Sequence, residues 1–511
     1  MTPDAEKVPS TPGAATENYN EDPKLWPTWI KIVALANICL CVFVGDTYVS
    51  GLTTGFDELA VAFQISNFGK IADLVYWSVF MQGVSNLFWM PIALCYGKRL
   101  VMILTLSIFV AGSIWSGVAN SFNSLMGARV VSAFGLGPVF SLGPSIIGDL
   151  FLERNFAAAM AVYAICLSAG SQIGPAIAGY MIAARGWRWF FYLLVILSAV
   201  NLIFVVLSFP ETTYRRVYFA DETAADYEEK GNEDSRVEAI ESVDARTQDR
   251  TPAKFSFRKN VFFLRHPCVE GGSPKKLFSI FLVPFAFILV PAVLFSAILF
   301  GLVMGWVIVI STLVPTLFSP APYYFTSKSI GLFSLSSFIG SFLSLPFAGV
   351  LTDTLSRYLR NRNGGVHKPE HRLPALIMPM IICPAGLFLF GFTTAKQDSY
   401  VLPAIGFSLQ STGLAMVPST MLSYVVDSFP ETSGEAMVLI HAGKSVVGFG
   451  LALRASDWLA ASGVRDQFIT MACIEFALIG ILGSILFIYG PRLRHMARHS
   501  KMFSKYQADS L

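Results

Sequence analysis

Charged residues are scarce in this sequence. Asp, Glu, Lys and Arg make up 14% of its 511 residues, whereas a soluble domain carries about 25%. Hydrophobic residues make up 54%, and the mean hydropathy is +0.57. So much apolar surface requires a lipid solvent, and the composition therefore excludes a soluble protein.

Cysteines are also few. The chain has seven, and none has metal-ligand spacing or belongs to a disulfide framework. We therefore expect no metal site and no cofactor. A cleaved signal peptide is not expected either, because the first apolar run, 30–50, follows a polar tail and lacks a small-residue cleavage site.

Long apolar runs dominate the rest of the chain. A helix needs about 20 apolar residues to cross a hydrocarbon core of about 30 Å. Twelve runs meet this length, near 30–50, 71–94, 100–119, 122–148, 157–182, 187–209, 286–311, 328–352, 374–394, 400–426, 435–460 and 467–490. The sequence predicts an all-α integral membrane protein with twelve transmembrane helices.

The runs fall into two sets of six, separated by a polar segment. We expect a disordered N-terminal tail over 1–29, a six-helix half over 30–209, a disordered linker over 210–276, a second half over 277–490 and a C-terminal tail over 491–511. Lysine and arginine favour short cytoplasmic loops, and their distribution predicts cytoplasmic termini and a cytoplasmic linker.

An internal repeat supports the two halves. Gly135 is followed by Leu136 and, fourteen residues after the glycine, by Asp149; Gly413, Leu414 and Asp427 repeat this spacing. The two blocks end the fourth helix of each half. Parallel repeats of this kind are a feature of transporters, so the pattern favours a duplicated transporter fold.

Helix 5 carries the most specific motif, "GSQIGPAIAGY" from Gly170 to Tyr180. Gly170, Gly174 and Ala178 form a small-residue stripe that permits close helix packing, and Pro175 removes a backbone hydrogen bond. The stretch resembles the antiporter motif of the major facilitator superfamily, in its fungal drug:proton antiporter branch. That resemblance implies a stripe that faces the other half as a hinge or seal; a plain packing stripe is the alternative.

Other stretches share the resemblance. "RVVSAFGLG", beginning at Arg129, is similar to the family's intramembrane arginine motif, but "PIALCYGKR" has Cys95 where the family carries an aspartate. The second half keeps Asp353 in the corresponding loop. We expect a cytoplasmic gate formed by the acidic and basic residues at these helix ends, Asp149, Glu153, Asp353, Arg357, Asp427 and Glu431.

Ionisable residues inside apolar spans are candidates for proton coupling. Asp46 in helix 1 is the expected proton-linked carboxylate, and Arg129 enters helix 4 to a similar depth and is its expected partner. A fixed structural ion pair, or an interfacial Asp46 if helix 1 ends early, is the alternative. Glu475 in helix 12 is a weaker candidate, expected to reach outward to the interface.

Helix 11 contains Gly443-Lys444-Ser445, the last three residues of a phosphate-binding loop. The first glycine of that loop is replaced by Val438, so the sequence excludes a nucleotide site. We expect His441, Lys444 and Met416 to line the substrate cavity, with Lys444 either meeting the substrate or joining two helices.

These features predict a secondary transporter, not an enzyme. The family resemblance implies a proton-coupled exporter of a drug, toxin or secondary metabolite; an uptake symporter for a nutrient or organic acid is the alternative, and an ATP-driven pump lacks its phosphate loop. The expected partners are a small-molecule substrate, protons and the lipid bilayer, with no nucleic acid. We expect a monomer in the plasma membrane.

Overall fold

A computed structural model describes residues 23–65, 67–213, 281, 284–285, 287–363, 368–397, 399–429 and 433–498. Within these ranges twelve helices are long and apolar enough to cross a membrane. The predicted all-α fold with twelve spans is therefore confirmed. The predicted linker is described only over 210–213, and the predicted tails only over 23–29 and 491–498, where the chain forms η1, the start of α2 and the last turns of α19.

Six spans come from the first half of the chain, which we define as residues 28–208. Its elements follow the short helix η1 (Pro23–Leu25). They are α2 (Thr28–Ser50), η2 (Gly51–Gly55), α3 (Phe56–Phe63), α4 (Phe68–Tyr96), α5 (Lys98–Val118), α6 (Phe122–Leu136), α7 (Val139–Leu150), α8 (Glu153–Arg185) and α9 (Trp187–Ser208).

The second half, residues 287–498, supplies the other six. Its elements are η4 (Phe287–Leu289), α13 (Pro291–Phe318), α14 (Ser327–Arg362), η5 (Pro369–Leu376), α15 (Ile377–Lys396), α16 (Val401–Ser411), α17 (Gly413–Ser428), α18 (Ser433–Ala452) and α19 (Ala455–Arg498).

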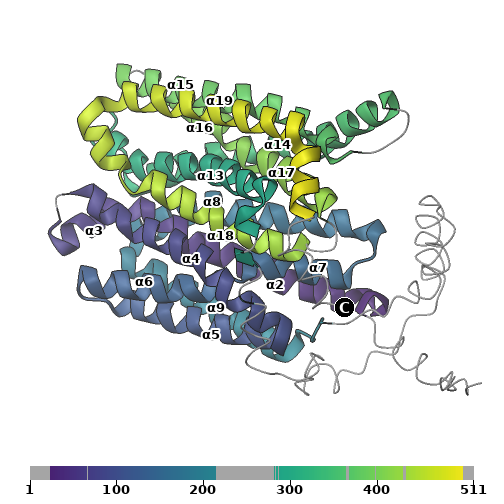
Figure 1. Ribbon diagram of the computed structural model, residues 1–511. Helices are drawn as coiled ribbons and strands as arrows, with labels where there is room; N and C mark the ends of the chain where they lie inside the picture. Colours follow the sequence, from purple (N-terminus) through teal and green to yellow (C-terminus); the bar gives the residue numbers. More distant parts are fainter. Residues whose placement is uncertain are drawn as a thin grey trace, which may run out of the picture.

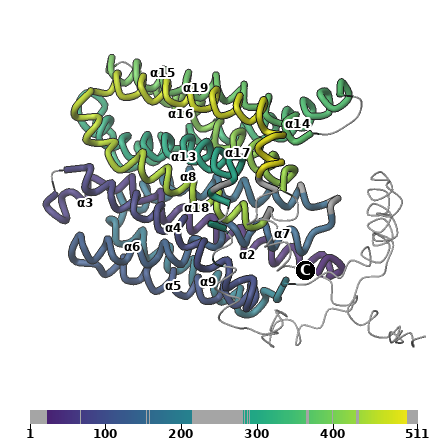
Figure 2. The backbone as a smooth tube through the Cα atoms, in the orientation of Figure 1, coloured from purple at the N-terminus to yellow at the C-terminus, as the bar shows by residue number. Residues whose placement is uncertain are grey.

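The long helices of both halves run side by side, with purple and blue helices of the first half below the green and yellow helices of the second (Figure 1; Figure 2). Helix α3 lies at one end of the bundle and the last turns of α14 at the other. We call these the α3 end and the η5 end. The halves meet where α4 packs against α18 and α8 packs against α14.

The first span continues well beyond Ser50. Helix α2 passes directly into η2 and then α3, so that one span covers Thr28–Phe63. Asp46 therefore lies in the interior of the span. An interfacial Asp46 at an early helix end, one of the alternatives left by the sequence, does not fit this geometry.

The fourth span of each half is divided near its middle. Helix α6 ends at Leu136 and α7 begins at Val139, while α16 ends at Ser411 and α17 begins at Gly413. Pro138 at the first break has no N–H to continue the helical hydrogen bonds. Both breaks coincide with the repeated Gly-Leu pairs, which strengthens the interpretation that the two spans are equivalent.

The small-residue stripe of α8 packs inside its own half. A Cβ atom on Gly170 would lie 2.6 Å from the Phe43 carbonyl oxygen, and one on Gly174 would lie 2.8 Å from the Thr47 Cα. Both neighbours belong to α2. The expectation that the stripe faces the other half is therefore wrong, because the face of α8 that meets α14 is the adjacent one, which carries Pro175.

Helix α14 repeats this arrangement. Its stripe comprises Ser336, Gly340, Ser344 and Ala348, and a side chain on Gly340 would overlap the Ser408 carbonyl oxygen of α16. Ser419 of α17 donates a hydrogen bond to the Ala348 carbonyl oxygen at 3.2 Å. Both stripes therefore hold helices together within one half, and other side chains form the boundary between the halves.

Candidate transport site

A small cavity lies between the two halves. It has a volume of about 90 Å³ and is lined by α2 and η2, α4 and α8 of the first half and by α13, α14 and α16 of the second. Its polar lining residues are Asp46, Ser50, Thr53, Gln82, Ser171, Gln172, Ser311, Thr312, Ser334 and Ser337. Sites for drug-sized ligands measure about 300–1,000 Å³, so this cavity must widen to admit such a ligand.

Asp46 is the carboxylate of this cavity. Its side chain lies beside Gln82 of α4 and interacts electrostatically with Lys444 of α18, across the boundary between the halves. The Nε2 atom of Gln82 is buried and has no hydrogen-bond partner among the described residues. Asp46 and Gln82 thus present an acceptor and a donor to the same small space.

Lys444 is 7% exposed. Its Nζ lies 4.4 Å from the ring centre of Phe300 in α13 and 5.5 Å from that of Phe140 in α7. Aromatic faces attract a cation, more strongly where water is excluded. The Lys444 ammonium is therefore stabilised by two aromatic rings and by the electrostatic interaction with Asp46. Its side chain lies behind the cavity wall and does not line the cavity.

The residues around Lys444 explain how a lysine is accommodated there. Side chains on Gly83 of α4 and Gly301 of α13 would overlap Ser445 and the Lys444 backbone. The two glycines bring α4 and α13 close to α18, as small residues do in membrane helices. The Gly-Lys-Ser sequence is thus a helix-packing element.

His441 and Met416 lie outside the cavity lining, as Lys444 does. The His441 ring packs against Phe300 with a centroid separation of 6.1 Å, and Met416 is 2% exposed within α17. The expected substrate-lining role of these three residues is not seen in this conformation, because none of them lines the cavity: His441 and Lys444 pack against Phe300 of α13, Lys444 also against Phe140 of α7, and Met416 is buried within α17.

Arg129 is fully buried and binds the end of α2. It donates hydrogen bonds to the carbonyl oxygens of Tyr48 and Val49, each at 3.1 Å, and to that of Leu74 at 2.8 Å. Its guanidinium also lies 4.8 Å from the Tyr48 ring centre. The last carbonyls of a helix lack intrahelical partners and attract cations, so Arg129 caps α2.

The expected pairing of Arg129 with Asp46 is therefore wrong. Asp46 lies before the last turn of α2, whereas Arg129 donates to the Tyr48 and Val49 carbonyl oxygens within that last turn. The cation with which Asp46 interacts electrostatically is Lys444.

Hydrogen bonds close the boundary between the halves at the α3 end. Ser319 donates to the Asp57 carboxylate at 2.7 Å, and Ser327 donates to Glu58. We call these two bonds the α3 clasp. Further from that end, Gln172 donates to Ser341 at 2.9 Å.

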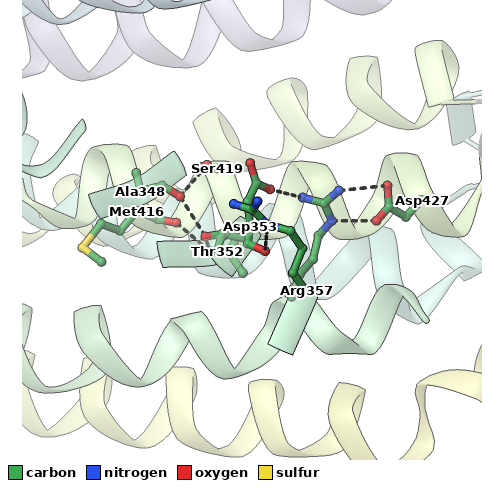
Figure 3. A network of polar contacts seen from close by, with 9 residues as sticks. Ala348, Thr352, Asp353, Arg357, Met416, Ser419 and Asp427 are labelled. Atoms are coloured by element: carbon green, nitrogen blue, oxygen red, sulfur yellow. Dashed lines mark hydrogen bonds and ion pairs between the residues drawn. The ribbon is translucent and has the colours of Figure 1, made fainter. Parts of the chain in front are cut away.

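A charged network occupies the η5 end of the second half (Figure 3). Arg372 of η5 binds Asp427 at 2.6 Å and Asp353 at 3.2 Å, and so joins α17 to α14. Arg357, expected in this gate, donates to the Asp353 carbonyl oxygen of its own helix at 3.3 Å and, among the described residues, forms no ion pair with Asp353 or Asp427. Asp353 and Asp427, both expected in the gate, share one arginine, and that arginine comes from η5.

The first half has a simpler counterpart. Lys98 of α5 binds Asp149 and the Ser145 hydroxyl, and Asp149 and Asp427 are the repeated aspartates. Cys95 occupies the place that Asp353 takes in the second half. The side chain of Glu153, at the start of α8, and the whole of Glu431 lie outside the described residues.

Three functional residues were missed by sequence reasoning. Gln82 and Gln172 are uncharged, although an amide inside an apolar span is itself a costly polar group and could have been noticed. Arg372 looked like one of several basic loop residues. Only the fold of η5 shows that it, and not Arg357, meets the two aspartates.

The geometry is that of a membrane transporter with a central site between two helical bundles. A family model described as "Major Facilitator Superfamily" matches residues 38–452. The chain belongs to the Major Facilitator Superfamily. It is accordingly a transporter and not an enzyme, as the sequence predicted.

Named relatives include fungal transporters. The chain is 26% identical to the MFS-type transporter penM of Penicillium rubens, covering 93% of this chain and 87% of that protein. It is 25% identical to the Efflux pump FUBT of Fusarium oxysporum, covering 94% and 75%. These similarities agree with the fungal branch to which the sequence was assigned.

The fold matches solved structures as well. A partially occluded inward open conformation of the xylose transporter XylE from E. coli aligns with a TM-score of 0.61 and 12% identity, over 91% of this chain and 98% of that one. At this identity the likeness concerns the fold alone.

Proposed function

We propose that this transporter exports small organic compounds in exchange for protons, and that Asp46 carries the exchanged proton. The observation that supports this best is the position of Asp46. It is the carboxylate of the cavity between the halves, and it interacts electrostatically with Lys444 of the opposite half.

Charge pairing supplies the coupling. An ionised Asp46 attracts Lys444, and this attraction is strengthened by the scarcity of water around both groups. A proton on Asp46 removes the attraction, so the free energy that holds α18 against the first half falls. Protonation therefore favours one arrangement of the halves and deprotonation the other, as alternating access requires.

Gln82 and Arg129 position the carboxylate. Arg129 fixes the last turn of α2 through the Tyr48 and Val49 carbonyl oxygens, four residues or fewer from Asp46. The Gln82 side chain lies beside Asp46 and can donate a hydrogen bond to its carboxylate. With α2 held in this way, Asp46 keeps its orientation while the second half moves.

Export is favoured over uptake by the relatives, two of which are named efflux pumps. A symporter for organic acids would use Lys444 as an anion anchor. Lys444 lies behind the cavity wall, against Phe300 and Phe140, and this position favours its role as the partner of Asp46. We further propose a monomer in the plasma membrane, with the η5 end and both termini in the cytoplasm.

The test is transport by the full chain in inside-out vesicles with an imposed pH gradient. Neutral, cationic and carboxylate compounds serve as the substrate panel. We expect gradient-driven uptake by the wild type and none by Asp46→Asn. Asp466→Asn, which changes an exposed carboxylate of α19, is the matched control and retains uptake.

Two results would overturn the proposal. Uptake that ignores the pH gradient excludes proton exchange, and gradient-driven uptake by Asp46→Asn removes Asp46 from coupling. Lys444→Gln separates the roles of the lysine. We expect it to weaken coupling for every substrate, whereas a loss confined to carboxylate compounds supports the symporter.

A further inference from the structure

Glu475 lies in the middle of α19 and is fully buried. The sequence suggested that it would reach outward to the interface, and the structure corrects this. Its Oε1 accepts a hydrogen bond from Gln410 Nε2 of α16 at 3.0 Å. The titratable group near it on α15 is the thiol of Cys383, which is also buried.

The surroundings of Glu475 do not suit a negative charge. In the described part of the chain no salt bridge reaches Glu475, and its hydrogen-bond partner is the uncharged Gln410. An ionised carboxylate without a cationic partner costs several kcal/mol in a dry interior, and such groups are neutralised instead.

Two unsatisfied atoms identify where the proton lies. Glu475 Oε2 and Gln410 Oε1 are both buried, and within the part of the chain that the structure describes neither has a hydrogen-bond partner. Both are acceptors when the glutamate is ionised, so they cannot bond to each other. One proton on Oε2 turns it into a donor and satisfies both atoms at once.

We propose that Glu475 and Gln410 form a neutral carboxylic acid–amide pair that holds a resident proton inside the second half. The amide donates through Nε2 to Oε1 of the acid, and the acid donates through its O–H to Oε1 of the amide. Two complementary hydrogen bonds then leave no buried polar atom of the pair unsatisfied.

The resident proton is separate from the one assigned to Asp46. Neither Glu475 nor Gln410 lines the cavity. Ser411, the residue after Gln410, bonds to Ser337 of the cavity wall at 2.6 Å, so the pair lies one layer behind that wall. Both members belong to the second half and stay together when the halves move.

Infrared spectroscopy of the reconstituted full chain tests the proposal. We expect the wild type to show the carbonyl stretching band of a protonated carboxylic acid in mildly alkaline buffer, and Glu475→Gln to lack it. Asp466→Asn is the control, because it removes an exposed carboxylate and leaves this band in place.

Thermal unfolding gives a second measurement. Glu475→Gln replaces the acid O–H donor by an amide N–H donor, so we expect an unchanged melting temperature in acidic and alkaline buffer. Gln410→Leu removes both the amide N–H and the carbonyl oxygen that bond to the acid, and we expect it to lower the melting temperature by several degrees. A missing acid band in the wild type, or a higher melting temperature for Glu475→Gln in alkaline buffer, would show an ionised Glu475 and overturn the proposal.

Discussion

Ser319 donates a 2.7 Å hydrogen bond to Asp57 and so joins α13 of the second half to α3 of the first. With the bond from Ser327 to Glu58, it forms the α3 clasp. A bond to a charged group contributes about 1.5–3 kcal/mol. Both carboxylates are partly exposed, so each of the two bonds contributes a free energy near the lower limit of this range.

Removing the clasp is predicted to open the α3 end. In the double variant Ser319→Ala and Ser327→Ala, the loss of two bonds at about 1.5 kcal/mol each shifts the equilibrium roughly a hundredfold toward the open arrangement. Spin-label distances between α3 and α14 measure this shift. Ser329→Ala, which alters a hydroxyl bonded only locally to Thr326, leaves the distances unchanged; an equal change in that variant would contradict the role of the clasp.

Alanine is predicted to be tolerated at Gly450 of α18 but not at Gly301 of α13, which packs against α18. In Gly301→Ala the new methyl group meets the Lys444 carbonyl oxygen at 2.8 Å, and such overpacking costs about 1–3 kcal/mol. Gly450→Ala has open space and gains helix propensity. We expect a lower melting temperature for the first and an equal or higher one for the second, and the reverse order would refute close α13–α18 packing.

Arg129→Lys is predicted to destabilise the protein despite its conserved charge. A lysine ammonium cannot reproduce the planar fork that reaches the Tyr48, Val49 and Leu74 carbonyl oxygens together. Loss of one or two of these bonds costs about 1–3 kcal/mol, measurable as a lower melting temperature. Arg188→Lys, at an exposed arginine that binds the Ala119 carbonyl oxygen, should be nearly neutral.

The η5 network gives a direct comparison of two arginines. Arg372→Ala removes the ion pairs to Asp353 and Asp427 that join α14 to α17, and we expect it to reduce stability by about 1–3 kcal/mol. Arg357→Ala removes one long bond to its own helix and should change stability by less than about 0.5 kcal/mol. Thermal unfolding distinguishes the two, and equal losses would argue against the bridging role of Arg372.

The length and polarity of the runs were enough to predict the twelve spans. The thickness of the hydrocarbon core fixes the length of a span, and its apolar character fixes the polarity of the residues. Asp46 and Lys444 stood out for a related reason, since a charged group within a span is costly. Their relationship was harder to foresee. Their similar depth in the membrane predicted an ion pair between Asp46 and Arg129, but depth does not fix which face of a helix a side chain occupies.

Orientation about the helix axis limited the other predictions as well. Spacing by four residues identified the stripe of Gly170 and Gly174 but not the helix that it meets. Arg357 shares the helix of Asp353, whereas Arg372 reaches the same carboxylate only because η5 folds back toward α14. These contacts depend on packing between distant segments, which residue spacing does not encode.

Gly443, Lys444 and Ser445 each meet a different neighbour. Gly443 approaches Ala297 of α13, Lys444 meets Phe140 of the first half, and Ser445 meets Gly83 of α4. Any rotation of α18 must therefore disturb both halves together, while the neighbouring Val446 remains 47% exposed. A fluorophore attached at Val446 would report on the whole transport cycle from one position without entering the packed interface.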